Sequence, residues 1–384
     1  MNIFKKTCIR TYQLIFKVGM KFIKFPKPHI LESLSDTIKY IKDEKVLILV
    51  PSYVYQNSIL KSFIEELDIN NVSYDLAIDD ISNPTIQLVN NYYKLYQPTL
   101  IIAIGGGSII DLAKLLAVKL TNKKDLKSMR GVMKVRKKPV PLIAVPTTSG
   151  SGSEATVAAV VTDDETHEKY PINDPKLVPK YVVFESSLTK TLNPFLTATT
   201  GMDALTHAVE CLIGKANTKQ TKEDAISAIK LIFDNLELAY NEPHNLECRY
   251  NMQKAAFLAG CAFTRGYVGY VHALAHQLGG LYKTSHGLAN AVLLPYVLEE
   301  FGSSISKTIE LLKKELGNSE FDLLDKIKQM NKSLDIPTYI DGLKETDFDL
   351  IISRAIKEAH PLYPVPELLD YDNFKTILSK AMKR

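Results

Sequence analysis

The sequence predicts an α/β domain built on a parallel sheet, followed by an all-helical domain. Before about residue 185, short β-rich runs alternate with segments of helical period, and after about residue 190 the β-rich runs are absent. A chain of 384 residues is long enough for two such domains, at roughly 150 residues each. Its 46% hydrophobic and 23% charged residues are typical of a globular protein and exclude a disordered or low-complexity chain.

The strands of the first domain are expected in five runs: residues 45–50, 72–78, 99–105, 141–146 and 181–185. The first and third runs are almost continuously apolar, which is typical of parallel strands covered on both faces. Segments of helical period at 58–67 and 84–96 lie between strands, in the order of a doubly wound sheet. The second domain is expected to begin with helices at 201–212, 221–240, 246–265 and 271–281. We place the two domains at residues 1–188 and 189–384.

The balance of charge gives little support for binding to a polyanion. The 47 basic and 43 acidic residues leave a net charge of +4, which is too weak to predict nucleic-acid or membrane binding. Residues 119–138 hold nine basic side chains and one acidic one, so this stretch is either a polyanion patch or a solvated helix and loop. The first 25 residues mix apolar and basic side chains. They are either an arm packed on its own domain or on a neighbouring subunit, or an amphipathic helix at a membrane surface.

The cysteines do not form a disulfide framework. There are four, far apart and without C-x-x-C spacing: Cys8, Cys211, Cys248 and Cys261. Disulfide frameworks belong to small secreted chains, which this is not. Reduced thiols in the cytoplasm are therefore expected.

A glycine-rich turn follows the third predicted strand. In IIAIGGGSIIDLAK, residues 101–114, an apolar run ends in Gly105, Gly106 and Gly107, and a helix is expected from Ser108. Glycines let a backbone approach a pyrophosphate closely, and the free N–H groups at a helix N-terminus can bind it. Because the pattern is not G-x-G-x-x-G, alone it indicates either a dinucleotide site or a tight turn.

A second loop rich in small residues follows the fourth predicted strand. The segment AVPTTSGSGSEAT, residues 144–156, carries four hydroxyl side chains before Glu154: Thr147, Thr148, Ser149 and Ser151. Such a loop could surround phosphate or ribose oxygens, or it could be a flexible connector.

Histidines at helical spacing indicate a metal site in the second domain. Asp203 and His207 lie four residues apart, on one face of a predicted helix, and His272 and His276 repeat that spacing. His286 follows in the next segment. One carboxylate and three imidazoles suit a divalent transition metal such as Fe²⁺ or Zn²⁺, with one position left for substrate. A single histidine of this kind would as readily be a core residue, but two pairs together favour a metal.

These four segments, in this order, resemble those of the iron-containing (group III) alcohol dehydrogenases. The resemblance runs from about residue 26 to residue 366, and it is closest to a subgroup with an arm like residues 10–22 and a basic segment like residues 134–138. It implies a Rossmann-like dinucleotide-binding α/β domain followed by an all-helical metal-binding domain.

The resemblance also implies a role for individual residues. The metal ligands would be Asp203, His207, His272 and His286. His276 would be a non-ligand histidine beside the nicotinamide, acting as a proton relay. The residues expected to hold the dinucleotide are Ser52, Asn83, Gly105, Gly106, Gly107, Ser108, Asp111, Thr147, Thr148, Val160 and Lys169.

Several positions depart from the family pattern. The first strand usually ends in Thr-Asp, whose carboxylate binds the adenosine ribose, but here it ends in Pro51 and Ser52. Without that carboxylate nothing is expected to repel a 2′-phosphate, so we expect NADPH to be accepted at least as well as NADH. Ser285 replaces a proline before the last ligand, and Arg265 and Tyr267 stand where many members have smaller residues.

The expected activity is that of a metal-dependent alcohol dehydrogenase or aldehyde reductase. It would transfer a hydride between NAD or NADP and a small alcohol or aldehyde, with Fe²⁺, or alternatively Zn²⁺, as a Lewis acid. We expect a homo-oligomer, a dimer, with no nucleic-acid or membrane partner. The alternatives are a zinc-dependent polyol dehydrogenase, a related lyase of the same fold, or a non-enzymatic binding protein that uses residues 119–138.

Overall fold

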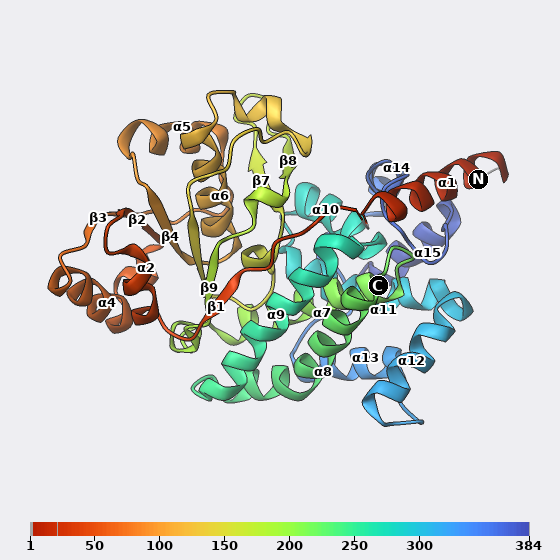
Figure 1. Ribbon diagram of the computed structural model, residues 1–384. Coiled ribbons are helices and arrows are strands. Elements are labelled where there is room, and N and C mark those ends of the chain that lie inside the picture. Colours follow the sequence, from red (N-terminus) through yellow and green to blue (C-terminus); the bar gives the residue numbers. More distant parts are fainter. Residues whose placement is uncertain (1–2, 21, 384) are drawn as a thin grey trace. The chain divides into compact units, whose positions relative to one another are not determined.

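The computed structural model describes residues 3–20 and 22–383 (Figure 1). The chain forms two compact units, each made of separate segments. The helical unit comprises Met1–Ile23, Asn193–Pro243 and Cys261–Arg384, and the α/β unit comprises Lys24–Leu192 and His244–Gly260. Two segments therefore group differently from the predicted continuous domains, while the boundary between residues 188 and 189 stays a prediction.

The first of these segments is the N-terminal helix α1 (Ile3–Met20). The guanidinium of Arg10 donates hydrogen bonds to the carbonyl oxygens of Val365 (2.8 Å) and Pro366 (3.1 Å). The amide of Gln13 donates to the carbonyl oxygen of Tyr363 at 2.6 Å. The arm thus packs on its own chain, within the helical unit. Among the described residues, no helix is long and apolar enough to cross a membrane.

The α/β unit is built on a six-stranded parallel sheet, in the order β1-β9-β6-β4-β2-β3. Its strands are β1 (His29–Leu31), β2 (Lys45–Val50), β3 (Ser73–Ile78), β4 (Leu100–Gly105), β6 (Leu142–Pro146) and β9 (Tyr181–Val183). All five predicted strands are present, and the predicted fold class is confirmed. Strand β1 was not predicted because three residues carry no periodic pattern.

Helices cover this sheet and bury its hydrophobic core. They are α2 (Ile38–Ile41), α3 (Ser52–Tyr55), α4 (Ser58–Ile69), α5 (Ile86–Leu95), α6 (Gly107–Thr121) and the first part of α9 (Leu246–Gly266). Leu60, Phe63 and Leu67 of α4 are buried against strand residues such as Ile48 and Ile102. The parallel arrangement brings the carboxyl ends of β2, β4 and β6 to one edge, where ligands bind in open α/β sheets.

A second, three-stranded sheet in this unit was not predicted. It consists of β5 (Gly131–Val132), β7 (Ala158–Thr162) and β8 (Lys169–Asn173), in the order β5-β8-β7. Strands β7 and β8 pair antiparallel, and Val160 is opposite Pro171. Strands this short alternate in burial over too few residues to be recognised in a sequence.

The helical unit contains no strand among its described residues. Its helices are α1, α7 (Pro194–Ile213), α8 (Lys219–Asn241), the end of α9, α10 (Tyr270–Tyr282), α11 (His286–Phe301), α12 (Ser306–Leu316), α13 (Leu323–Ser333), α14 (Phe348–Ala359) and α15 (Tyr371–Ala381). Helix α11 is central, because it contacts α7, α10, α13 and α15. Helix α7 is almost entirely buried, which places its polar side chains in the interior.

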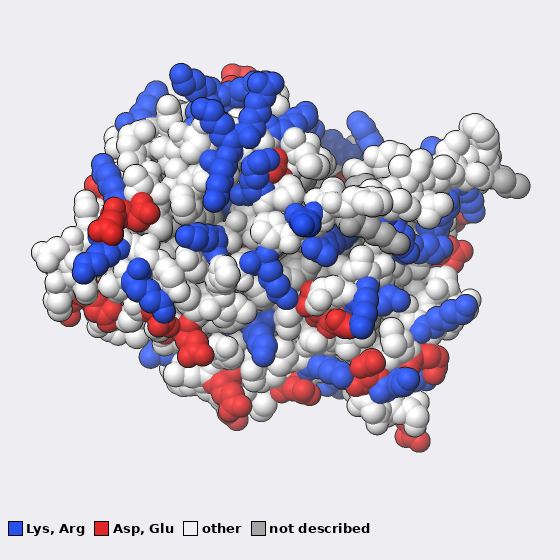
Figure 2. Space-filling model, in the orientation of Figure 1, with Lys and Arg blue, Asp and Glu red and all other residues white. Residues whose placement is uncertain are grey.

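The basic stretch 119–138 is a solvated surface with part of its charge paired. Lys127 Nζ lies 2.6 Å from Glu165 Oε2 and 3.2 Å from Asp163 Oδ2. Arg130 Nη1 lies 2.8 Å from Glu168 Oε2. Figure 2 shows Lys and Arg side chains gathered at the top of the view, over the α/β unit. Ion pairs of this kind favour the interpretation as a solvated face over a polyanion site.

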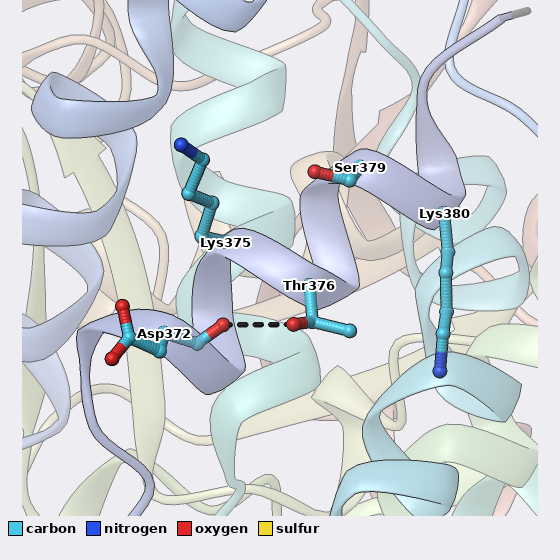
Figure 3. A pocket seen from close by; sticks show the side chains of 5 residues that line it. All are labelled: Asp372, Lys375, Thr376, Ser379 and Lys380. Carbon is cyan, nitrogen blue, oxygen red and sulfur yellow. Dashed lines mark hydrogen bonds between the residues drawn. The ribbon is translucent and has the colours of Figure 1, made fainter.

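A surface hollow of about 360 Å³ runs along helix α15 (Figure 3). All its lining residues belong to that one helix: Asp372, Lys375, Thr376, Ser379 and Lys380. The Thr376 hydroxyl donates to the backbone carbonyl of Asp372 at 2.9 Å. This hollow holds no residue of the predicted sites.

Candidate metal centre and cofactor site

Helix α7 carries the first two predicted metal ligands. The Asn193 side chain caps the helix by accepting a hydrogen bond from the Leu196 N–H at 2.8 Å. Asp203 and His207 lie about one turn apart on the helix, and each is only 5% exposed. A carboxylate and an imidazole buried on the same face of a helix require partners.

The third predicted ligand, His272, is held by a buried carboxylate. Its Nδ1 lies 2.6 Å from Oε2 of Glu210 on α7. The same carboxylate accepts hydrogen bonds from the N–H groups of Gly269 (2.8 Å) and Val271 (2.7 Å) at the start of α10. Burial raises the pKa of Glu210 to about 7, although hydrogen bonds from the backbone N–H groups of Gly269, Val271 and His272 oppose the rise. With Nδ1 engaged by Glu210, Nε2 of His272 is left to face the other ligands.

The fourth predicted ligand, His286, is the first residue of α11. The next residue must be glycine, because a Cβ on Gly287 would lie 2.3 Å from the carbonyl oxygen of Thr199 on α7. The N-terminus of α11 therefore approaches α7 closely. The replacement of a proline by Ser285 leaves His286 beside Asp203, with Nε2 lying 3.4 Å from Oδ1.

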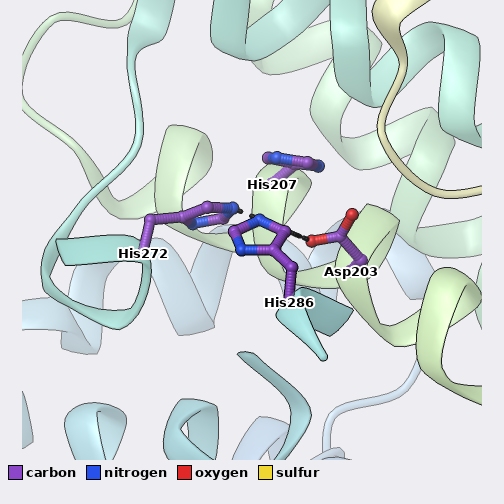
Figure 4. Close-up of side chains that lie close together, drawn as sticks. All are labelled: Asp203, His207, His272 and His286. Carbon is purple, nitrogen blue, oxygen red and sulfur yellow. Dashed lines mark ion pairs between the residues drawn. The ribbon is translucent and has the colours of Figure 1, made fainter. Parts of the chain in front are cut away.

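The four side chains converge on one point (Figure 4). One ligand atom from each residue lies within 4.8 Å of those from the others: Asp203, His207, His272 and His286. The rings of His207 and His272 are stacked, with centroids 4.5 Å apart. Burial, together with the neighbouring histidines, lowers the pKa of His272 well below its ordinary value. A neutral imidazole is the form that coordinates a metal, so this donor set fits a divalent ion such as Fe²⁺ or Zn²⁺.

Asn290 is a further buried polar residue at this cluster. Its Nδ2 lies 2.7 Å from Asp203 Oδ1, and 3.2 Å from Nε2 of both His272 and His286. It is fully buried, on α11, one turn after His286. Neither Asn290 nor Glu210 was predicted from the sequence. Their spacing could have revealed them, since Asn290 follows His286 by four residues and Glu210 follows Asp203 by seven, which places each pair on one helix face.

His276, the predicted non-ligand histidine, lies next to the cluster. Its ring stacks on that of His286, with centroids 5.2 Å apart. Its Nδ1 lies 2.6 Å from Oε1 of Glu358 on α14, and that oxygen also accepts a hydrogen bond from the Tyr363 hydroxyl at 2.8 Å. Packing by the surrounding protein disfavours the charged imidazole, but Glu358 outweighs this and raises the pKa of His276.

Five of the predicted cofactor residues lie at the carboxyl ends of β4 and β6: Gly105, Gly106, Gly107, Thr147 and Thr148. Gly105 ends β4, Gly106 is the N-cap of α6, and α6 begins at Gly107. A Cβ on Gly107 would lie 2.7 Å from the Ser151 hydroxyl, so only glycine lets the two loops approach this closely. Thr147 is buried after β6, and Thr148 lies against Gly106. The N-terminus of α6 thus has the backbone geometry of an anion site.

Two other predicted cofactor residues bind one another. The carboxylate of Asp111 accepts hydrogen bonds from the Ser153 hydroxyl (2.5 Å) and from the Val160 N–H (3.0 Å). Burial raises the pKa of Asp111. Asp111 therefore connects α6 to the hydroxyl-rich loop and to β7, and Val160 keeps a partly exposed side chain.

A second pair lies near the start of α5. Lys169 Nζ donates to Asn83 Oδ1 at 2.6 Å, which brings β8 to the loop before α5. The Ser108 hydroxyl donates to the backbone carbonyl of Ser82 at 2.6 Å. Asn83, Lys169 and Ser108 are thus brought to one region, at the N-terminus of α6.

The region of Ser52 differs from the expectation. The Ser52 N–H donates to Asp80 Oδ1 at 2.8 Å, and its hydroxyl donates to Asp80 Oδ2. A carboxylate therefore lies beside Ser52, because Asp80 follows the end of the neighbouring strand β3. A sequence pattern at the end of β2 could not reveal Asp80, which lies 28 positions after Ser52 in the chain.

Tyr267, one of the residues that depart from the family pattern, lies beside the His276 region. Its ring centroid is 6.1 Å from that of Tyr363, whose hydroxyl donates to Glu358. Burial raises the pKa of Tyr267. Arg265 lies two residues before it, at the end of α9.

A parallel sheet with a glycine turn, and a cluster of three histidines and one aspartate of which only His286 is exposed, are the features of a metal-dependent dehydrogenase. Family models support this class over most of the chain. The model described as "Iron-containing alcohol dehydrogenase" matches residues 25–186, and the model for the C-terminal part of the "Fe-containing alcohol dehydrogenase family" matches residues 197–382.

Individual relatives agree with the family models. Alcohol dehydrogenase 4 of Schizosaccharomyces pombe is 37% identical over 342 residues, covering 84% of this chain and 78% of the relative. The NADPH-dependent butanol dehydrogenase of Clostridium saccharobutylicum is 36% identical, covering 72% of this chain and 76% of the relative. The structure of an alcohol dehydrogenase from Oenococcus oeni matches with a TM-score of 0.87 at 31% identity, covering 93% of this chain and 99% of that one.

The chain belongs to the iron-containing alcohol dehydrogenase family. It is an oxidoreductase, a metal-dependent alcohol dehydrogenase. Iron and a nicotinamide dinucleotide are the cofactors that fit its two sites.

Proposed function

We propose that this enzyme interconverts short primary alcohols and aldehydes with NAD or NADP as the hydride carrier. One divalent ion, Fe²⁺, would be held by Asp203, His207, His272 and His286. The observation that carries the proposal is the convergence of these four ligand atoms within 4.8 Å of one another. The substrate class is supported by the Clostridium relative, which is named as a butanol dehydrogenase.

The bound ion would supply Lewis-acid chemistry to the oxygen of the substrate. Glu210 fixes the ring of His272, so that Nε2 faces the other ligands. Glu358 fixes the ring of His276 in the same way through Nδ1, which leaves Nε2 available to hold or move a proton. We therefore assign His276 as the proton relay and Glu358 as the residue that positions it.

The dinucleotide would bind at the carboxyl edge of the parallel sheet. The N–H groups at the start of α6 would hold its pyrophosphate. Asn83, Ser108, Thr147, Thr148, Val160 and Lys169 would surround the ribose and nicotinamide. Asp111 would act indirectly, because both of its oxygens already accept hydrogen bonds within the protein.

We further propose a cytoplasmic dimer. The described cysteines are all free thiols, which supports a reducing compartment. Light scattering of the purified protein would measure the number of subunits.

Metal analysis of protein purified without oxygen, combined with an NAD(P)H absorbance assay on short-chain aldehydes, tests the proposal. Asp203→Ala should lose both metal and turnover. His276→Ala should keep the metal while kcat falls by about 10²–10⁴-fold. If His276→Ala empties the site, or His272→Ala leaves it full, the ligand assignment is wrong. Zinc in the site together with oxidation of polyols alone would instead favour a polyol dehydrogenase.

A further inference from the structure

We propose that Asp80 selects NAD over NADP in this enzyme. Its carboxylate would accept hydrogen bonds from the adenosine ribose hydroxyls and would repel a 2′-phosphate. The inference rests on the proposed function only in requiring that a dinucleotide binds at the turn between β4 and α6. It reverses the expectation from the sequence that NADPH is accepted at least as well as NADH.

The sheet brings Asp80 to the position of the missing carboxylate. Strands β2 and β3 are parallel neighbours, with Val50 opposite Ile78. Ser52 and Asp80 are each two residues beyond that last pair, so they emerge side by side at the carboxyl edge of the sheet. The N–H and the hydroxyl of Ser52 bind one oxygen each of the Asp80 carboxylate. The serine that replaces the family's aspartate therefore binds another aspartate beside it.

The carboxylate keeps capacity for a ligand. A carboxylate offers about four lone-pair positions, and Ser52 uses two of them. Asp80 is exposed, so the remaining positions are open to solvent. The hydrogen bonds from Ser52 lower the pKa of Asp80, which keeps it ionised at neutral pH. Among the described residues, no Lys or Arg forms an ion pair with Asp80 that would neutralise this charge.

This edge of the sheet is next to the pyrophosphate site. Strand β2 lies between β3 and β4 in the sheet, and the glycine turn directly follows β4. The Tyr53 hydroxyl lies 2.7 Å from Thr147 Oγ1, which connects the segment after β2 to the loop after β6. In dinucleotide-binding sheets, an acidic residue at a neighbouring strand end binds the ribose, and its charge excludes the extra phosphate of NADP.

A purely structural role for Asp80 must be separated from selection of the cofactor. Its carboxylate accepts the first N–H of the short helix α3, and an asparagine oxygen could do the same. Asp80→Asn therefore keeps an acceptor at this position while removing the charge. Asp75→Asn is the matched control, since it removes the same charge from strand β3, which precedes Asp80, at a distance of roughly 16 Å.

Titration calorimetry of the metal-loaded enzyme with NAD⁺ and with NADP⁺ tests the inference, alongside kcat/KM for NADH and NADPH. The wild type should bind NAD⁺ at least tenfold more tightly than NADP⁺. Asp80→Asn should reduce that ratio by tenfold or more, equivalent to about 1.4 kcal/mol, whereas Asp75→Asn should leave it within about twofold of wild type. Ser52→Asp should weaken binding of both dinucleotides, because it places a second carboxylate against Asp80.

Two results would overturn the inference. One is a wild type that binds NADP⁺ as tightly as NAD⁺, and the other is an Asp80→Asn variant with an unchanged ratio. Failure of the proposed function itself would give a different result, because neither dinucleotide would then bind to the wild type or to any of the three variants.

Discussion

Glu210 and His272 form a buried pair that joins helix α7 to the start of helix α10. The distance between Glu210 Oε2 and His272 Nδ1 is 2.6 Å, and both side chains are at most 3% exposed. The carboxylate also binds two backbone N–H groups at the start of α10. One residue thus caps the helix that carries His272 and sets the orientation of its ring.

Glu210→Gln should weaken metal binding more than it unfolds the protein. Glutamine replaces one of the two carboxylate oxygens with an N–H₂ group, which donates and cannot accept. At least one of the buried donors that now bind Glu210 would therefore lose its acceptor. Residues that orient a metal-bound histidine typically change metal affinity by about 10–100-fold. The rate of metal release to a chelator, measured on folded protein, checks this. A variant that has a native circular dichroism spectrum and releases its metal at the wild-type rate would contradict the role given to Glu210.

Asn290→Leu should also weaken the metal site, through a different contact. The Asn290 amide donates toward Asp203 Oδ1, and leucine keeps a similar volume but removes that donor. We expect metal affinity to fall by about tenfold or more. Asn331→Leu is the matched control, because Asn331 is also a buried asparagine but donates to the Ala291 carbonyl instead. Equal metal content in both variants would show that Asn290 only fills space.

The metal ligands could be predicted because helical spacing is visible in a sequence. Asp203 and His207 share a face whatever the rest of the fold does. Asp80 could not be predicted in this way, because it meets Ser52 only through the pairing of β2 with β3. Glu358 reaches His276 from another helix, 82 residues along the chain. The short strands β5, β7 and β8 were missed because pairing across the sheet, and not local pattern, defines them.

Glu358→Gln should move the pH dependence of turnover to lower pH. The carboxylate raises the pKa of His276, so removal of its charge should lower that pKa. A proton-accepting His276 is active when deprotonated, and the ascending limb of kcat for alcohol oxidation should therefore shift to more acidic pH. Because the pKa of His276 is raised, the ion pair between Glu358 and His276 stabilises the folded protein at low pH, and this stabilisation is lost as pH rises through the pKa of His276 in the folded state. Glu358→Gln removes the ion pair, so the stability of the variant should not show this decrease.

The control for this shift is Glu299→Gln in the same unit. Glu299 forms ion pairs with Lys328 at 2.6 Å and with Lys380 at 2.9 Å. None of these three residues is part of the candidate site. The pH profile of this variant should coincide with that of wild type. An identical shift in both variants would attribute the effect to net charge and not to the contact between Glu358 and His276.

Lys114 is a fully buried cation that anchors the hydroxyl-rich loop to helix α6. Its Nζ donates to the carbonyl oxygens of Ser153 (2.5 Å), Thr156 (2.9 Å) and Ala158 (2.8 Å). Burial lowers the pKa of Lys114 to about 8, although the nearby carboxylates of Asp111 and Glu154 oppose the change. Lys114 therefore holds both the loop after β6 and the start of β7, together with Asp111 on the same helix.

Lys114→Met should strongly destabilise the protein and weaken dinucleotide binding. Methionine fills a similar volume but leaves several buried carbonyl groups without a donor and Asp111 and Glu154 without a counter-charge. Removal of one partner from a buried charge network typically costs about 3–5 kcal/mol of unfolding free energy. Lys119→Met on the same helix is the matched control and should cost less than about 1 kcal/mol, since Lys119 is partly exposed. Urea denaturation of both variants measures these differences, and NADH titration of the folded fraction measures the effect on the cofactor site. A Lys114→Met variant as stable as the Lys119→Met control would show that the loop is anchored by other contacts.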